Sequence, residues 1–216
     1  TLTVEHAYKV GRFLGWYYGQ KTPGEKCRIV IGKDTRKSGD MLEAALTAGL
    51  CSMGAKVIPL GVVPTPAVAY LTRYYKADAG VVISASHNPC EYNGIKFFNS
   101  DGYKLSDGIE NEIESYILGE KAIEELPTHG KVGYVSANHN AVEDYVAFAV
   151  STIDCRLDGM KIAVDCANGA SYETAFKALN KLGANVEAIH NTPDGVNINH
   201  MCGSTHMESL QAYVTS

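Results

Sequence analysis

One supersecondary unit occurs twice in this chain, and this repeat constrains the fold more than any other feature. A strand around Ile29, a polar loop and a helix lead to the tetrapeptide Gly-Ala-Lys-Val at 54–57. The same order around Ile162 leads to Gly-Ala-Asn-Val at 183–186. An internal repeat indicates repeated structure, and the order strand, helix, strand is typical of parallel βαβ units. We therefore predict two similar three-layer α/β domains with mixed, mostly parallel sheets.

The predicted domain boundary lies just before a helix at 138–152 that joins the two parts. The second part holds too few strands to complete a sheet. We therefore expect domain I at 1–137, a partial domain II at 138–216, and a chain that is the first portion of a longer protein. Further helices are expected at 3–20, with Thr3 as N-cap, at 40–53 and at 171–182. One more helix should begin at 64, and another should follow the N-cap Asp107. Strands are expected at 28–31, 56–60, 131–135, 160–165 and 185–189.

Composition narrows the classes of partner. The net charge of −5 comes without basic clusters, which argues against nucleic acid or anionic membrane as a partner but leaves small anionic substrates open. No run approaches the roughly 18–20 apolar residues of a membrane-spanning helix, and no leader is expected. The six cysteines lack paired spacing, so reduced, buried thiols in a cytoplasmic protein are expected rather than disulfides or a metal site.

The segment 80–98 is the first place to look for chemistry. An apolar strand at 80–83 ends in the polar loop Ser84-Ala-Ser86-His87-Asn88-Pro89. A turn then leads into a second apolar run at 95–98, which contains Lys96. Loops at the carboxyl ends of strands in open α/β sheets bind ligands, and a lysine buried in an apolar strand needs an anionic partner.

Ser86 next to His87 does not indicate a serine hydrolase. Neighbouring side chains at a strand end point to opposite sides, and no Gly-x-Ser-x-Gly elbow surrounds Ser86. A plain polar turn remains an alternative. The loop 33–39 also follows a strand and precedes a helix N-terminus, where phosphate binds well. A hydroxyl, Lys96 and Arg36 would together suit a phosphoryl group, while the alternative for Arg36 is a surface ion pair with Asp34.

The chain resembles the α-D-phosphohexomutase superfamily, which includes phosphoglucomutase and phosphomannomutase. The segments at 83–89 and 93–98 look like its phosphoserine loop. The Ser-Ala-Ser-His-Asn-Pro and Cys-Gly-Ser-Thr-His forms resemble the branch that acts on glucosamine phosphate. Supporting segments follow in family order at 32–39, 64–70, 164–170 and 197–206.

The resemblance implies an isomerase of four domains around a central cleft. Ser86 would carry a phosphoryl group and interconvert glucosamine 6-phosphate and glucosamine 1-phosphate through a sugar 1,6-bisphosphate, in the synthesis of UDP-N-acetylglucosamine and cell-wall precursors. Lys96 would contact phosphate or assist proton transfer. His87 and Asn88 would shape the loop, with His87 counted among the catalytic residues and Asn88, like Arg36, among the phosphate-binding ones.

The resemblance also implies Mg²⁺, which would bridge the Ser86 phosphate and three aspartates. Those aspartates are expected beyond Ser216, and the sugar-binding loops in further C-terminal domains, so these 216 residues alone are expected to be inactive. Asp165 is expected to cap a tight loop rather than to bind metal. Family members allow a homodimer. The alternatives are a phosphomannomutase/phosphoglucomutase of the same superfamily and a non-catalytic relative that binds phosphosugars.

Overall fold

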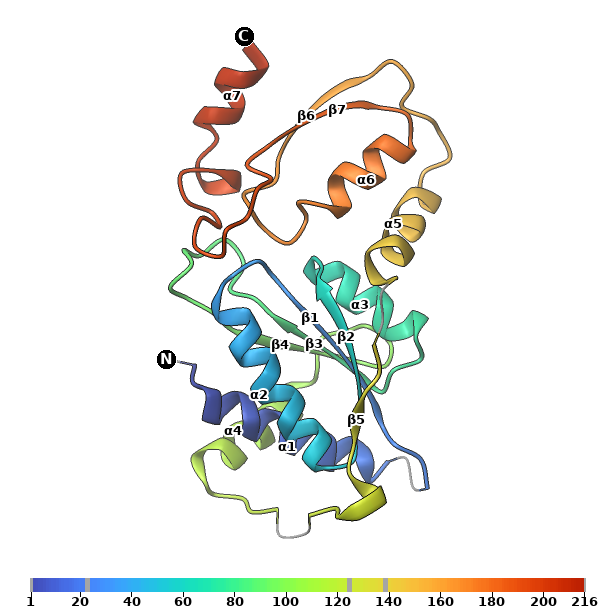
Figure 1. Ribbon diagram of the computed structural model, residues 1–216, viewed down its shortest axis with the longest axis vertical. Coiled ribbons are helices and arrows are strands. Elements are labelled where there is room, and N and C mark those ends of the chain that lie inside the picture. Colours follow the sequence, from blue (N-terminus) through green and yellow to red (C-terminus); the bar gives the residue numbers. More distant parts are fainter. Residues whose placement is uncertain (1, 22–23, 124–125, 138–139, 216) are drawn as a thin grey trace.

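The structure is a computed structural model that describes residues 2–21, 24–123, 126–137 and 140–215 (Figure 1). Short 3-10 turns lie at His129–Lys131 and Gly203–Thr205. The elements follow in the order α1 (Val4–Gly19), β1 (Arg28–Lys33), α2 (Ser38–Ser52), β2 (Lys56–Val62), α3 (Thr65–Tyr74), β3 (Ala79–Ile83), β4 (Ile95–Asn99), α4 (Asp107–Leu118), β5 (Tyr134–Val135), α5 (Ala141–Ser151), β6 (Lys161–Asp165), α6 (Thr174–Lys181), β7 (Asn185–Ile189) and α7 (Glu208–Thr215).

The larger sheet has five strands in the order β4-β3-β1-β2-β5. β1 pairs in parallel with both β2 and β3, β5 is parallel to β2, and only β4 runs antiparallel. The central strands are apolar almost throughout, with every residue of β3 buried, because helices cover both faces of the sheet. The predicted mixed, mostly parallel sheet is confirmed.

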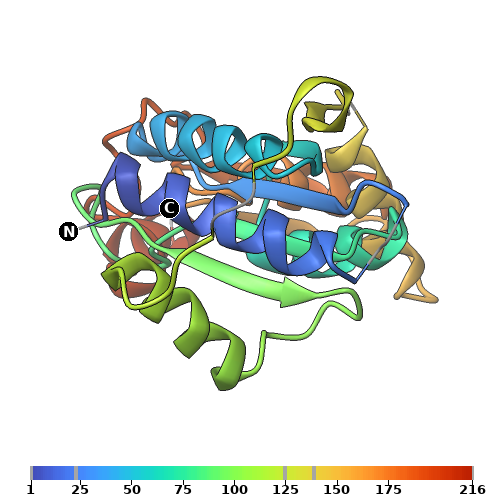
Figure 2. The same ribbon diagram turned by 90° about the horizontal axis from the view of Figure 1, so that it is seen from below.

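Two apolar clusters define the layers of this part. One cluster joins α1, α2 and α4 to one sheet face, and its fully buried members include Phe13 and Leu46. The other joins α3 and the start of α5 to the opposite face, around Val68 and Leu71. Figure 2 shows α1 lying alongside α2 when the molecule is seen from below. The sheet is thus the middle layer of three, as predicted.

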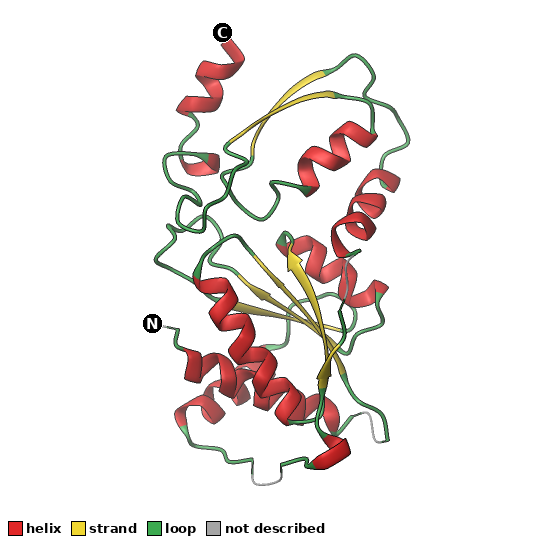
Figure 3. Ribbon diagram, viewed as in Figure 1, coloured by secondary structure: helices red, strands yellow, loops and turns green. Residues whose placement is uncertain are grey.

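The repeated unit forms a second, smaller sheet. β6 and β7 pair in parallel with α6 between them in the chain, which repeats the β1-α2-β2 arrangement. Gly54 and Gly183 both follow the helix of their unit in the left-handed region, with φ of 89° and 95°, where glycine is favoured after a helix. Figure 3 shows the two sheets in separate parts of the molecule. The boundary at 137–138 stays a prediction, because residues 138–139 lie outside the described residues.

Several local predictions need correction. α4 begins one residue earlier than expected, with Ser106 rather than Asp107 as its N-cap. The strand expected at 131–135 is reduced to the two residues of β5. All six cysteines are free thiols, of which Cys155 is exposed rather than buried. Within the described ranges, no helix is both long and apolar enough to cross a membrane.

Candidate active site

The candidate site lies where the sheet changes its direction of winding. The chain leaves β1 through α2 towards β2 on one side, whereas β3 and β4 lie on the other side of β1. Ligands bind outside the carboxyl ends of the strands at such a point. The loop after β1 is joined to the end of β3 here, since the Asp34 backbone N–H donates to the Ile83 carbonyl at 3.0 Å.

The loop at 84–94, which we call the Ser86 loop, is closed by its own hydrogen bonds. The Ser84 N–H donates to the Gly94 carbonyl at 2.9 Å, and Ser84 Oγ accepts from the Ser86 N–H at 3.1 Å. Ser86 has a φ of 59°, which is uncommon for a residue with a side chain. Its side chain is exposed. The loop therefore presents one hydroxyl to solvent from a fixed backbone.

Arg36 holds this loop from beneath. Its side chain is buried, with 2% of the residue exposed. It pairs with Asp34, which is also buried, through an Nε–Oδ2 distance of 2.9 Å. The remaining donors go to four loop carbonyls, namely those of Ser86 (3.0 Å), Asn88 (2.8 Å), Pro89 and Tyr92 (2.9 Å).

The role of Arg36 differs from the predicted one. A guanidinium has five N–H donors, and all five are engaged by Asp34 and the Ser86 loop. None is left for a phosphate, so the prediction of direct phosphate binding by Arg36 is wrong for this structure. The ion pair with Asp34 exists, but in the interior rather than on the surface.

The ammonium group of Lys33 is also engaged by protein side chains. Its Nζ lies 2.5 Å from a carboxylate oxygen of Asp40 and 2.5 Å from one of Glu43. Partial burial lowers the pKa of Lys33, but the hydrogen bonds to these two carboxylates outweigh that effect, and the pKa is raised. The ammonium therefore stays charged and is held at the start of α2.

Lys96 is placed differently from the expectation of burial. It lies on the edge strand β4 opposite Val82, and its side chain is exposed while the next residue, Phe97, is buried. Alternation along the strand puts the two side chains on opposite faces. The ammonium is therefore free to meet a ligand, and its proposed role does not rest on desolvation.

His87 and Asn88 are both exposed on the Ser86 loop. Asn88 Nδ2 donates to the Ala85 carbonyl at 2.9 Å, a contact that supports the loop. Phosphate binding by Asn88 and a catalytic role for His87 stay predictions.

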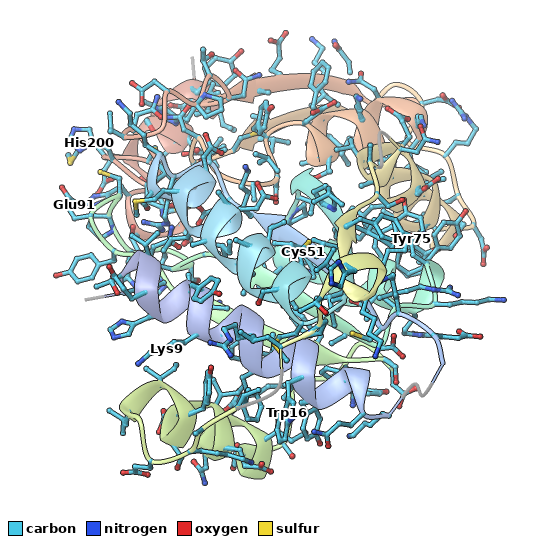
Figure 4. All side chains as sticks on the ribbon, turned by 60° about the horizontal axis from the view of Figure 1, so that its bottom comes forward. Lys9, Trp16, Cys51, Tyr75, Glu91 and His200 are labelled. Carbon is cyan, nitrogen blue, oxygen red and sulfur yellow. The ribbon has the colours of Figure 1, made fainter. Side chains whose placement is uncertain are left out.

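The second part of the chain also contacts the Ser86 loop. Asn199 Nδ2 donates to the carbonyls of Ser86 at 2.9 Å and of Asn88 at 3.0 Å. In Figure 4, Glu91 and His200 lie on the same side of the molecule, on the two loops that meet here. Sequence reasoning missed Asn199. It belongs to a segment that carries the family resemblance, but nothing in the sequence assigned it a role.

Two further hydrogen bonds join the loop after β1 to the second part. Thr35 Oγ1 donates to the Asn168 carbonyl, and the Lys37 N–H donates to the Gly195 carbonyl at 2.8 Å. Gly195 has a φ of 95°, and a Cβ there would lie 3.1 Å from the Lys37 Cβ. The backbones thus approach closely.

Unusual backbone conformations gather at this junction. Left-handed residues other than glycine cost free energy and tend to cluster at functional sites. Two of those in the described residues, Lys76 and His129, lie elsewhere in the chain. The others are Ser86, Ala167, Asn168, His190, Asn199 and Met201.

In the described ranges, one group of neighbouring side chains consists of residue types that can bind a metal ion. The candidate ligand atoms of Asp165, His190 and Cys202 lie within 4.8 Å of one another. The two Asp165 oxygens already accept backbone N–H groups of Ala167 and Gly203, each at 2.8 Å. These bonds agree with the predicted capping role, and a set that includes a thiolate suits softer metals than Mg²⁺.

Known proteins are similar to this chain in sequence and in fold. Residues 1–124 match the family described as phosphoglucomutase/phosphomannomutase, alpha/beta/alpha domain I. Phosphoglucosamine mutases of Clostridium acetobutylicum and Acetivibrio thermocellus are each 58% identical over 99% of this chain. The chain covers 47% of each, about half their length. A phosphoglucomutase/phosphomannomutase family protein from Burkholderia thailandensis superposes with a TM-score of 0.80 at 26% identity, over 100% of this chain and 46% of that one.

Proposed function

This chain belongs to the phosphoglucomutase/phosphomannomutase family, and we propose that its Ser86 carries the phosphoryl group of a phosphohexomutase. The substrates would be glucosamine 6-phosphate and glucosamine 1-phosphate, because the relatives at 58% identity are named phosphoglucosamine mutases. The observation that carries the proposal is the exposed Ser86 hydroxyl on a loop whose backbone is held by the buried Arg36.

The proposed reaction moves one phosphoryl group at a time. The bond between phosphorus and Ser86 Oγ breaks as a bond forms to the free hydroxyl of the sugar monophosphate. The hydroxyl loses its proton and the serine oxygen regains one, which leaves a free serine and a sugar 1,6-bisphosphate. After the bisphosphate turns over, the reverse step returns its other phosphate to Ser86. Phosphoryl transfer of this kind depends on positioning and on neutralising charge.

This chain's contribution is mostly positioning. The hydrogen bonds of Arg36 and Asn199 fix the carbonyl of Ser86 and so the direction in which its side chain leaves the backbone. The N-terminus of α2 lies at the same edge, since Asn93 Nδ2 donates to Ser38 Oγ at 3.0 Å. The positive end of a helix dipole there favours a phosphate. Lys96 would contact phosphate or assist the proton transfer.

The proposed cofactor is Mg²⁺. This ion takes oxygen ligands. A phosphorylated Ser86 would offer phosphate oxygens at an exposed position, so this residue could supply one ligand to Mg²⁺. The group of Asp165, His190 and Cys202 fits it poorly. Bound Mg²⁺ would neutralise negative charge on the transferring group. Its other ligands, three aspartates by family resemblance, would come from elsewhere in the whole protein.

The same reasoning extends to the arrangement of the whole protein. We propose residues 1–137 as domain I and 138–216 as part of domain II, with further domains that complete a cleft around the hexosamine phosphate and its bisphosphate. A cytoplasmic location and a homodimer are part of the proposal, and both rest on the family.

Intact-protein mass spectrometry with peptide mapping tests the function. We expect one phosphate on Ser86 after incubation with glucosamine 1,6-bisphosphate, and loss of both this phosphate and turnover in Ser86→Ala. The whole protein should convert glucosamine 6-phosphate faster than mannose or glucose 6-phosphate. Sugar phosphate binding without any phosphate on Ser86 would instead indicate a non-catalytic binding protein, and the opposite substrate order would overturn the assignment to glucosamine.

A further inference from the structure

Asn199 contacts the same two carbonyls of the Ser86 loop as the buried arginine. Arg36 donates one N–H each to the carbonyls of Ser86 and Asn88, at 3.0 and 2.8 Å. Asn199 Nδ2 donates to both as well, at 2.9 and 3.0 Å. A carbonyl oxygen has two lone pairs, so both donors can bond each carbonyl at once. The peptide planes after Ser86 and Asn88 are therefore held from two sides, one of which belongs to the second part of the chain.

The Asn199 amide is itself held in place. Its backbone N–H donates to the Ala167 carbonyl at 2.9 Å, and its φ of 58° is one that asparagine tolerates better than most residues. Asp165 secures both segments, because its two carboxylate oxygens accept the Ala167 and Gly203 N–H groups. The backbone from which the amide extends is thus held by the loops that follow β6 and β7, not by the Ser86 loop.

We propose that Asn199 is a positioning residue for phosphoryl transfer at Ser86. This inference rests on the proposed function of Ser86. Asn199 acts through the Ser86 loop backbone, since both of its hydrogen bonds to the loop end on carbonyls. Ser86 has a left-handed φ, and without the amide its backbone regains freedom to turn away from that conformation. The serine oxygen would then be misplaced in the transition state while the sugar still binds.

The test compares Asn199→Ala with Thr35→Val in the whole protein. Thr35 Oγ1 also joins the two parts, by its bond to the Asn168 carbonyl, but in the described part of the chain it donates no hydrogen bond to the Ser86 loop. If Asn199 acted only by docking the two parts, both variants would lose activity alike. Asn199→Asp keeps the side-chain shape and replaces the amide donor by a charged acceptor that faces two carbonyls.

We expect Asn199→Ala to lower kcat for glucosamine 6-phosphate by about 10-fold, and Asn199→Asp by more, because small misplacements of reacting groups cost up to about 100-fold. KM should change by less than about twofold, and Thr35→Val should lower kcat by clearly less than Asn199→Ala does. Amide hydrogen exchange at 85–92 should be faster in Asn199→Ala than in Thr35→Val. The exchange readout does not depend on catalysis.

Wild-type kcat and exchange in Asn199→Ala, or an equal loss in Thr35→Val, would overturn the role of Asn199 and leave that of Ser86 standing. Turnover that survives in Ser86→Ala would overturn the proposed function and this inference with it. A thermal unfolding midpoint within about 2 °C of wild type confirms that the Asn199→Ala protein is folded. If the midpoint of Asn199→Ala is lower than that, Asn199→Asp is compared with Thr35→Val instead, and the same outcomes in kcat and exchange decide.

Discussion

Gly11 on α1 and Gly49 on α2 face each other where the two helices touch. A Cβ on Gly11 would lie 2.2 Å from the Leu46 carbonyl oxygen and 3.1 Å from the Gly49 Cα. A Cβ on Gly49 would lie 2.2 Å from the Tyr8 carbonyl oxygen. Backbone atoms cannot move aside as side chains do, so the missing side chains are what allows α1 to pack on α2.

Gly49→Ala should therefore destabilise the fold. Overpacking at a closely packed site costs about 1–3 kcal/mol, and we expect a loss in that range from urea unfolding. Gly19→Ala is the matched control, because Gly19 ends α1 and a Cβ there meets no atom within 4 Å. It should be neutral or slightly stabilising. Equal stability of the two variants would contradict this account of the α1–α2 contact.

Arg36→Ala should destabilise the protein and release the Ser86 loop. Removing one member of a buried ion pair costs about 3–5 kcal/mol, since Asp34 would keep a buried charge without its partner. We expect a loss of this size in denaturant unfolding, with faster hydrogen exchange at 85–92.

The chain supplies a control for this variant. Arg156 also pairs with an aspartate two residues away, Asp158, but both side chains are exposed. Surface pairs contribute little, so Arg156→Ala should leave the unfolding midpoint unchanged. A comparable loss in both variants would mean that burial is not what makes Arg36 important.

Alkaline pH should destabilise the fold through Cys27 and Tyr18. Burial, with Asp78 nearby, raises the pKa of the Cys27 thiol from 9.0 to about 12. Burial and the neighbouring Tyr17 raise the pKa of Tyr18 from 10.0 to about 12. In the unfolded chain the Cys27 thiol loses its proton around pH 9 and the Tyr18 phenol around pH 10, while the folded chain keeps both protons up to about pH 12. The contribution of these two groups to the free energy of unfolding is fully present below pH 9 and is lost as the pH rises towards 12.

Urea unfolding between pH 8 and 12 measures this effect. Each group can lower the free energy of unfolding by at most about 1.4 kcal/mol per pH unit over its range. Cys27→Ala should flatten the dependence from pH 9 upwards, whereas Cys155→Ala, at an exposed position, should reproduce the wild-type curve. A wild-type slope in Cys27→Ala would show that this thiol does not contribute.

The 216 residues alone should not turn over glucosamine 6-phosphate, with or without Mg²⁺. In the proposed reaction Ser86 is the group that this chain contributes to phosphoryl transfer, and the carboxylates that would complete a Mg²⁺ site are proposed to lie elsewhere in the protein. A coupled assay of the purified chain, set beside the whole protein at equal concentration, checks this. Mg²⁺-dependent conversion by the chain alone would refute it.

Local patterns predicted much of the fold. The bounds of β7 match those expected, and α1 begins after its predicted N-cap, Thr3, whose side chain accepts the His6 N–H. Such features depend on residues a few positions apart, which periodicity and capping rules describe. The prediction that Lys96 is buried was wrong, because an apolar run does not reveal that its strand lies at the edge of the sheet.

The site was predictable only in part. The Ser86 loop was recognisable because its residues are contiguous, but the function of Arg36 depends on carbonyls 50 to 56 positions away. Asn199 lies 113 and 111 residues from the two carbonyls it binds. Backbone carbonyls have no sequence signature, so neither contact could be derived before the strand order and the docking of the two parts were known.

These separations also set an order of events during synthesis on the ribosome. Arg36 is translated 50 residues before its partner at Ser86, and Asn199 follows Ser86 by 113 residues. A nascent chain that has just completed its large sheet can therefore hold the Ser86 loop through Arg36 only. The contact from Asn199 must wait until β6 and β7 have emerged, so the growing protein passes through a stage in which Ser86 is present but the second contact that we propose to position it has not yet formed.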